Sequence, residues 1–214
     1  NSKRNDLNKI NEQLSKSNLK NSIISLDINE FKNNINKINA KNEEVTLNQM
    51  SNMSNINKSL LIAKEQCKDL VYFVEDDYLH KLEAIKEMIF AYERISSQIN
   101  RELILCPTDY PYLYTKIDPT NIFLGSTKHW RTVGETLCTF LTSKSMLEKH
   151  WEKFISMCKF EHYPFEKPLH EIYKSEYCLS PIPSLAFHFT NINSIFGLSP
   201  NADWKKIWND NESY

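Results

Sequence analysis

Apolar residues recur every three or four positions in several stretches of the chain, the spacing that places them on one face of a helix. Ile56, Leu60 and Ala63 form one such face. Ser143 precedes another, where its hydroxyl can cap the first turn. From this spacing we predict helices over residues 6–17, 31–38, 56–67, 78–97, 143–157 and 168–173, and a short helix that carries Trp204 and Trp208.

Shorter apolar runs predict strands between these helices. The run from Leu70 to Val74 is continuously apolar and is bounded by Asp69 and Glu75, as expected of a strand that is covered on both faces. We therefore expect it to be a central, parallel strand. Further strands are predicted over residues 23–28, 103–106, 122–124, 136–141 and 185–189. Because helices and strands alternate, the pattern favours the α/β class, with a mostly parallel sheet flanked by helices.

Length and composition limit the class of protein. The chain has 214 residues, of which 41% are hydrophobic and 25% charged, values typical of one globular domain. Its formal net charge of -1 does not give the cationic surface of a nucleic-acid-binding protein, so we expect no nucleic-acid partner. Only three glycines occur, at positions 125, 134 and 197. They cannot form a Walker loop or a dinucleotide-binding fingerprint, so a phosphate ligand would need a metal ion or basic side chains.

Cysteines and apolar runs bear on the compartment. The five cysteines lie 20 to 39 residues apart without a Cys-x-x-Cys pair, so neither a disulfide framework nor a zinc ribbon is expected. No apolar run approaches the ~20 residues of a membrane-spanning helix. We expect a cytoplasmic protein without a transmembrane segment, and peripheral association with a membrane stays open.

Three adjacent carboxylates, Glu75, Asp76 and Asp77, directly follow the predicted strand of residues 70–74. In open α/β sheets, ligands bind beyond the carboxyl ends of the strands. Adjacent carboxylates repel one another, and a hard divalent cation with oxygen ligands relieves that repulsion. The alternative is an acidic turn in which Asp76 or Asp77 caps the following helix.

The segment Asn55 to His80, which reads NINKSLLIAKEQCKDLVYFVEDDYLH, resembles the middle of a GT-A nucleotide-sugar glycosyltransferase. In that superfamily a helix with a polar start, an apolar strand led by Asp and an acidic DXD-type motif follow in this order. The resemblance extends over residues 50–92. It implies one GT-A-like domain over residues 1–214, with a nucleotide-sugar-binding half at 1–105 and an acceptor-side half at 106–214. It also implies that an N-terminal βα unit is missing before Asn1.

The same resemblance implies a Mn²⁺ or Mg²⁺ cofactor. Asp77 would bind the metal that bridges the donor's phosphates, while Asp76 and Glu75 would position the ribose, a metal-bound water or the sugar. The fit departs from the plain DXD spelling, because Glu75 stands first and no residue separates the two aspartates. His188 is the candidate second metal ligand. Its alternative is a structural role between two phenylalanines, since imidazole is less typical than oxygen for these metals.

Sugar transfer with inversion also needs a base that takes the proton of the attacking hydroxyl. We rank Glu135 first, at the entrance to a predicted strand, followed by Asp109 and then Glu171. Each has a structural alternative, as a turn residue or an exposed helix residue. Arg131, in a segment that we interpret as a loop, is a candidate phosphate clamp because its planar guanidinium binds phosphate in a bidentate manner. Its alternative is a surface salt bridge.

Together with these residues, the resemblance implies a metal-dependent glycosyltransferase that moves a sugar from a nucleotide diphosphate donor to a saccharide or lipid-linked acceptor, with inversion. Surface polysaccharide biosynthesis is the setting that the resemblance implies. Two alternatives remain. One is a noncatalytic α/β domain that binds a cation or a partner through the acidic cluster, and the other is a nucleotidyltransferase.

Overall fold

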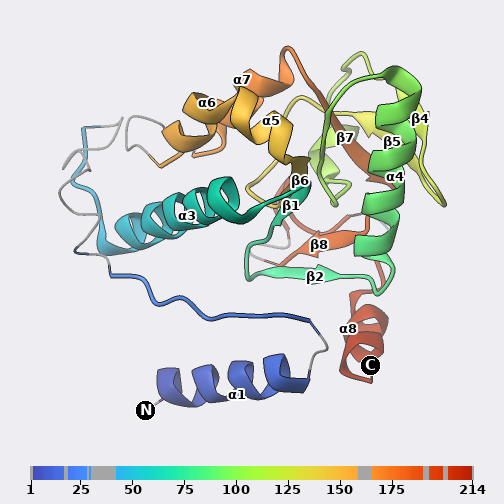
Figure 1. Cartoon of the computed structure of the whole chain (residues 1–214). Coiled ribbons are helices and arrows are strands. Elements are labelled where there is room, and N and C mark those ends of the chain that lie inside the picture. The colour runs from blue at the N-terminus through green and yellow to red at the C-terminus, as the bar shows by residue number, and fades with distance from the viewer. Residues whose placement is uncertain are drawn as a thin grey trace.

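Six strands form the main sheet in the part of the chain that the structure describes. The computed structural model describes residues 2–16, 19–27, 29, 42–158, 165–189, 193–199 and 202–213 (Figure 1). Within these residues the strand order is β1 (Leu70–Phe73), β6 (Phe140–Ser143), β3 (Leu103–Leu105), β7 (Tyr177–Ile182), β5 (His129–Thr132) and β4 (Ile122–Leu124).

The directions of these strands correct one expectation. The protein is α/β as predicted, but the sheet is mixed: β3 and β7 pair in parallel, and the other four pairings between described strands are antiparallel. The run at 70–73 is a strand, but it lies at the edge of the sheet and is half-buried. Val71 and Phe73 pack on one hydrophobic cluster, and Leu70 and Tyr72 pack on the other. A continuously apolar strand is therefore one whose two faces are both packed against other residues. A strand at the edge of a sheet can be packed in this way as well as a central one.

Helices cover both faces of the main sheet. On one face lie α3 (Leu47–Gln66), α5 (Lys144–Lys149), α6 (Trp151–Ser156) and α7 (Lys167–Tyr173), and on the other lies α4 (Ala84–Ile99) (Figure 1). Strand β3 shows the division, because Ile104 packs in the first cluster while Leu103 and Leu105 pack in the second. The three layers place the carboxyl end of β1 beside α3.

Local sequence signals set several helix ends. Thr46 caps α3 in a capping box with Gln49. The hydroxyl of Ser143 accepts a hydrogen bond from Met146 N, as predicted for the start of α5. The helix predicted over 143–157 is divided at His150 into α5 and α6. Pro168 lies in the first turn of α7, where its missing N–H costs no hydrogen bond.

A separate two-stranded ribbon lies beside the main sheet. It pairs β2 (Tyr78–His80) with β8 (Ala186–His188) in antiparallel orientation. Tyr78 and Leu82 were expected in a helix, but α4 begins at Ala84, because pairing with β8 extends the chain at residues 78–80. Helix α8 (Trp204–Glu212) lies against β2, and Asn211 Nδ2 donates to His80 O over 2.9 Å.

The remaining elements differ in part from the sequence predictions. Helix α1 (Ser2–Lys16) forms as expected, and a single-turn 3-10 helix, η1, covers Pro111–Tyr114. Residues 23–27 are irregular where a strand was predicted, and the helix predicted at 31–38 lies outside the described residues. Strand β6 begins at Phe140, later than predicted, and β5 and β7 were not predicted. None of the helices among the described residues has the length and apolar character needed to cross a membrane.

Candidate functional site

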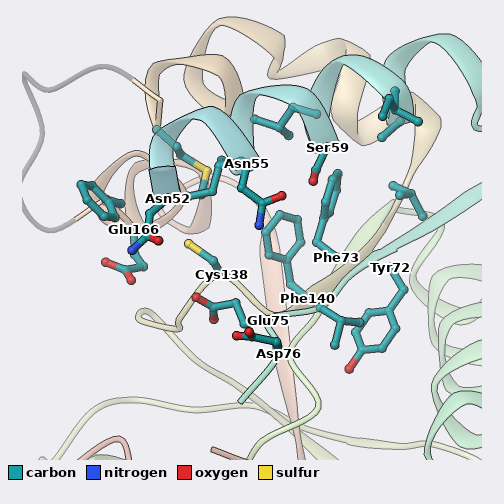
Figure 2. A pocket seen from close by; sticks show the side chains of 18 of the residues that line it. Asn52, Asn55, Ser59, Tyr72, Phe73, Glu75, Asp76, Cys138, Phe140 and Glu166 are labelled. Atoms are coloured by element: carbon teal, nitrogen blue, oxygen red, sulfur yellow. The ribbon is translucent and has the colours of Figure 1, made fainter. Parts of the chain in front are cut away.

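A pocket of about 850 Å³ opens at the carboxyl end of β1. We call it the acidic pocket, because Glu75, Asp76, Asp77 and Glu166 all line it. Glu75 and Asp76 follow β1 after one intervening residue, and Glu166 immediately precedes α7, far along the chain (Figure 2). Among the described lining residues there is no lysine or arginine. The volume lies within the range of small-molecule sites, and the lining favours a cation.

Asp77 contacts the predicted second ligand, His188. The ribbon register places Tyr78 opposite His188, and Phe189 N donates to Asp77 O over 2.9 Å, so the two segments are fixed side by side. Asp77 Oδ2 lies 3.1 Å from His188 Nε2. The other ring nitrogen, Nδ1, lies 2.9 Å from the carbonyl oxygen of Phe196.

The carbonyl oxygen of Phe196 determines which nitrogen of His188 carries hydrogen. A carbonyl oxygen only accepts hydrogen bonds, so Nδ1 is the donor. Nε2 therefore faces Asp77 Oδ2 either as a donor in an ion pair or with its lone pair, and in the second case one cation could be bound by both atoms. A histidine that donates from one nitrogen to a backbone carbonyl is also the usual arrangement of a metal-bound imidazole.

Two other carboxyl groups of the acidic pocket have raised pKa values. Burial raises the pKa of Glu75 to about 7, and the nearby charges of Asp77 and Glu166 add to the shift. The hydroxyl of Thr139, 3.4 Å from Glu75 Oε2, opposes it. Burial also raises the pKa of Glu166, while the charges of His170 and His188 lower it. These carboxylates are therefore close enough to repel one another in a poorly hydrated site.

The side of the acidic pocket formed by α3 is polar but uncharged. Asn52, Asn55 and Ser59 lie on the face of α3 that lines the pocket (Figure 2). Amide and hydroxyl groups there can donate hydrogen bonds to a ligand as well as accept them. These residues and Glu166 were not predicted from the sequence. Ser59 could have been identified as a candidate, because it is a polar residue on the otherwise apolar helix face of Ile56, Leu60 and Ala63.

The three predicted base residues lie elsewhere and do not line the acidic pocket. Glu135 forms an ion pair with Lys116 over 2.9 Å, and both side chains are about two-fifths exposed. Glu171 pairs with Lys174 on the exposed side of α7, and its hydrogen bond with that lysine holds its pKa below the usual value.

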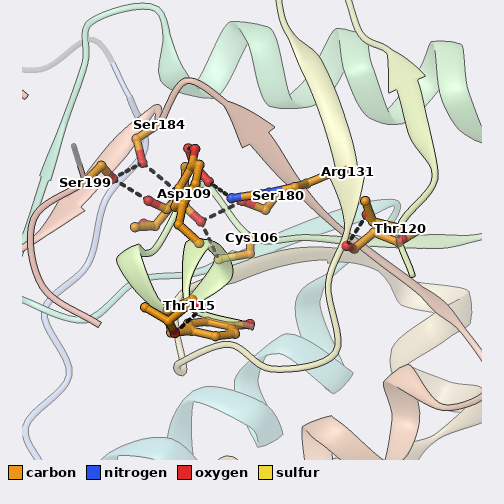
Figure 3. Close-up of polar contacts among 12 residues, drawn as sticks. Cys106, Asp109, Thr115, Thr120, Arg131, Ser180, Ser184 and Ser199 are labelled. Atoms are coloured by element: carbon orange, nitrogen blue, oxygen red, sulfur yellow. Dashed lines mark hydrogen bonds and ion pairs between the residues drawn. The ribbon is translucent and has the colours of Figure 1, made fainter. Parts of the chain in front are cut away.

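The third, Asp109, is buried and accepts hydrogen bonds from Arg131 and Tyr114 (Figure 3). Arg131 lies on strand β5, not in a loop, and its guanidinium also stacks 4.6 Å from the centre of the Tyr114 ring. The structure therefore brings Asp109 and Arg131 to each other and brings neither to the acidic pocket.

A metal site formed entirely by protein ligands is not present in the described part of the chain, since no three His, Cys, Asp or Glu side chains are grouped closely enough to hold an ion. Asp77 and His188 form a pair, with Glu75, Asp76 and Glu166 around the same pocket. The chain matched no known protein family, no curated protein and no solved structure in three separate comparisons.

Proposed function

We propose that the protein is a metal-dependent glycosyltransferase that binds a nucleotide diphosphate sugar in the acidic pocket and transfers the sugar to a saccharide or lipid-linked acceptor. The observation that carries this proposal is the Asp77–His188 pair at the edge of a pocket with four carboxylates and, among its described lining residues, no lysine or arginine. A diphosphate would be repelled there, and only a bound cation reverses that repulsion.

Asp77 and His188 are the residues that would hold Mn²⁺ or Mg²⁺. Asp77 supplies a hard oxygen, and His188 supplies Nε2 while its Nδ1 is held by Phe196 O. When bound, the ion supplies charge stabilisation to the departing diphosphate. With only these two protein ligands, the ion would remain accessible to the phosphates of a donor, as is common for Mg²⁺.

Glu166 is the residue best placed to accept the proton of the acceptor hydroxyl. It lines the acidic pocket, and its raised pKa brings it closer to neutrality, where a general base is most effective. Glu135 forms an ion pair with Lys116, and Asp109 forms one with Arg131, both outside this pocket. Glu75, with a pKa of about 7, is partly protonated at neutral pH and can donate a hydrogen bond to a sugar or ribose oxygen.

Metal binding and turnover test this proposal separately. We expect the protein to bind Mn²⁺ in a titration followed by electron paramagnetic resonance. With a panel of UDP-, GDP- and dTDP-sugars, it should release the nucleoside diphosphate only when metal is present. Asp77→Asn and His188→Gln should each weaken Mn²⁺ binding by about tenfold or more. Glu171→Gln, which removes an exposed carboxylate outside the pocket, is the matched control and should leave binding unchanged.

The outcomes distinguish the alternatives. Mn²⁺ binding without release of any nucleoside diphosphate identifies a noncatalytic cation-binding domain. Release of pyrophosphate from a nucleoside triphosphate identifies a nucleotidyltransferase. Mn²⁺ binding that is the same in wild type, Asp77→Asn and His188→Gln would contradict the assignment of the metal ligands.

The base is tested by comparing carboxylates. Glu166→Gln should lower transfer by about 10²-fold or more while Mn²⁺ and nucleoside diphosphate binding remain within about twofold. Glu135→Gln, on the surface, is the control. If Glu135→Gln reduces transfer as much as Glu166→Gln does, the assignment of the base is wrong.

A further inference from the structure

Two aromatic residues lie directly against His188. The ring of Tyr78 lies 5.0 Å from the imidazole, measured between ring centres, and the two planes are inclined by 34°. The carbonyl oxygen of Phe196 accepts the hydrogen of His188 Nδ1 over 2.9 Å. Tyr78 therefore limits the plane of the imidazole, and Phe196 determines which ring nitrogen faces Asp77.

Tyr110 contacts both of these aromatic residues. It directly precedes η1 and is buried, with 1% of its surface exposed. Its hydroxyl oxygen forms a hydrogen bond of 2.5 Å with the hydroxyl oxygen of Tyr78. Its ring meets the ring of Phe196 edge-on, with 5.4 Å between the centres and 73° between the planes, an arrangement that aromatic pairs favour. Tyr110 thus joins two segments that reach His188 from distant parts of the chain.

The segment that carries Phe196 is also held by η1 and the residues just before it. Tyr112 N donates to Ile195 O over 2.9 Å, and Ser199 Oγ donates to Asp109 O over 2.6 Å. The rings of Tyr112 and Phe196 lie 4.9 Å apart. The position of the Phe196 carbonyl oxygen therefore depends on how this segment packs against η1.

The pairing of β2 with β8 fixes the backbone near His188 but not its side chain. Phe189 N donates to Asp77 O, which sets the distance between the two segments. A histidine side chain can still rotate about two bonds, χ1 and χ2. Either rotation would move Nε2 away from Asp77 Oδ2, which lies 3.1 Å from it. The contacts with Tyr78 and Phe196 oppose these rotations.

We propose that Tyr110 is a positioning residue that keeps His188 Nε2 directed at Asp77, through the hydroxyl of Tyr78 and the ring of Phe196. Tyr110 does not line the acidic pocket, so it acts through these neighbours and not on a ligand. Residues that orient a metal-binding histidine contribute to metal affinity. The proposal rests on the proposed function only for this consequence, because the orientation of His188 can be measured without metal.

Hydrogen exchange at His188 Nδ1 tests the proposal in the metal-free protein. The hydrogen is observed by NMR in ¹⁵N-labelled protein and is assigned by its absence in His188→Gln. Tyr110→Phe removes only a hydroxyl, and Tyr78→Phe removes the same hydrogen bond from its half-buried partner. We expect each variant to raise the exchange rate by about fivefold or more, because the imidazole leaves its position more often. In Mn²⁺ titrations, each variant should raise the Kd by about threefold or more.

Phe196→Leu tests the second contact, since it removes the ring and keeps the carbonyl oxygen. It should also raise the exchange rate by about fivefold or more. Tyr92→Phe is the matched control for the tyrosine variants, because it removes a hydroxyl that is bonded over 2.5 Å to Glu102 beyond α4. Phe123→Leu is the control for Phe196→Leu, because it removes a half-buried ring that meets Tyr177 edge-on. Both controls should leave the exchange rate and the Kd within about twofold.

The outcomes separate positioning from a purely structural role. The proposal is overturned if exchange in Tyr110→Phe and Tyr78→Phe stays within about twofold of wild type, or if both controls accelerate it equally. It is also overturned if the Nδ1 hydrogen of wild type exchanges too fast to be observed, because the imidazole is then not fixed. An unchanged Kd in Tyr110→Phe, where wild type binds Mn²⁺, equally overturns it. If exchange changes as expected but wild type binds no Mn²⁺, the positioning role is supported and the proposed metal site is wrong.

Discussion

Replacing Glu75 by glutamine is expected to stabilise the protein above neutral pH. Burial next to Asp77 and Glu166 raises the pKa of Glu75 from 4.5 to about 7. In the unfolded chain its pKa returns to an ordinary value. Between these two values the folded protein binds more protons than the unfolded chain, so the free energy of unfolding falls as pH rises. Ionisation of Glu75 in the native protein therefore lowers the free energy of unfolding.

The size of this effect follows from the shift. Each pKa unit corresponds to 1.36 kcal/mol, so the penalty is at most about 3 kcal/mol at pH 8. For a chain of this length, that corresponds to roughly 6–12 °C in Tm. Glutamine keeps the size of the side chain and an oxygen that can accept from Thr139, but it cannot ionise. The increase in the free energy of unfolding of Glu75→Gln over wild type should be near zero at pH 4 and should approach the full value at pH 8.

Urea denaturation of wild type and Glu75→Gln at several pH values between 4 and 8, with metal chelated, measures this difference. Glu171→Gln is the control, because its carboxylate is exposed and its pKa is lowered, not raised. A second expectation links the effect to the proposed cation: Mn²⁺ should stabilise wild type more at pH 8 than at pH 5, because protonated carboxyl groups bind it poorly. If the stability difference between wild type and Glu75→Gln is the same at every pH, the assigned pKa of Glu75 is wrong.

Two further predictions concern carboxylates that hold the fold. Glu87 is buried and accepts hydrogen bonds from the turn between β4 and β5, including two from Thr127, so Glu87→Gln should cost about 2–4 kcal/mol in urea denaturation. Glu93→Gln, on the exposed face of the same helix, should stay within about 0.5 kcal/mol, and equal losses in the two variants would refute the assignment. Asp109→Asn should cost about 3–5 kcal/mol, because it leaves the largely buried guanidinium of Arg131 without its carboxylate. A loss below about 1 kcal/mol would show that this buried ion pair contributes little to the stability of the fold.

Local signals in the sequence predicted local structure well. The cap at Ser143, the proline in the first turn of α7 and the strand at 103–105 all follow from interactions within a few residues. The order and direction of the strands depend on contacts between distant segments. The edge position of β1 is one example, since its apolar run is the same whether one neighbouring strand or two pair with it.

The ribbon shows how pairing between distant segments overrides local periodicity. Tyr78 and Leu82 fit the helical spacing of the following segment, yet residues 78–80 are extended because β8 pairs with them. That pairing is also what brings His188 to Asp77 across 111 positions of the chain. The histidine was predicted from the resemblance and not from any spacing. Glu166 was missed because nothing in its immediate sequence indicates that α7 begins beside the end of β1.

The surroundings of a buried carboxylate distinguish one that is satisfied within the protein from one that can bind a ligand. Asp109 is almost fully buried, but Arg131 and Tyr114 satisfy its charge, so it needs no ligand. Glu75 and Glu166 lie in a pocket with no lysine or arginine among its described lining residues. Burial raises the pKa of both, and the charges of Asp77 and Glu166 add to the shift of Glu75. Charge repulsion that the protein leaves uncompensated is released when a cation binds. The acidic pocket is therefore the place where ligand binding should stabilise the protein most. We expect Mn²⁺ at pH 8 to stabilise Glu75→Gln less than wild type. Glu171→Gln should be stabilised as much as wild type.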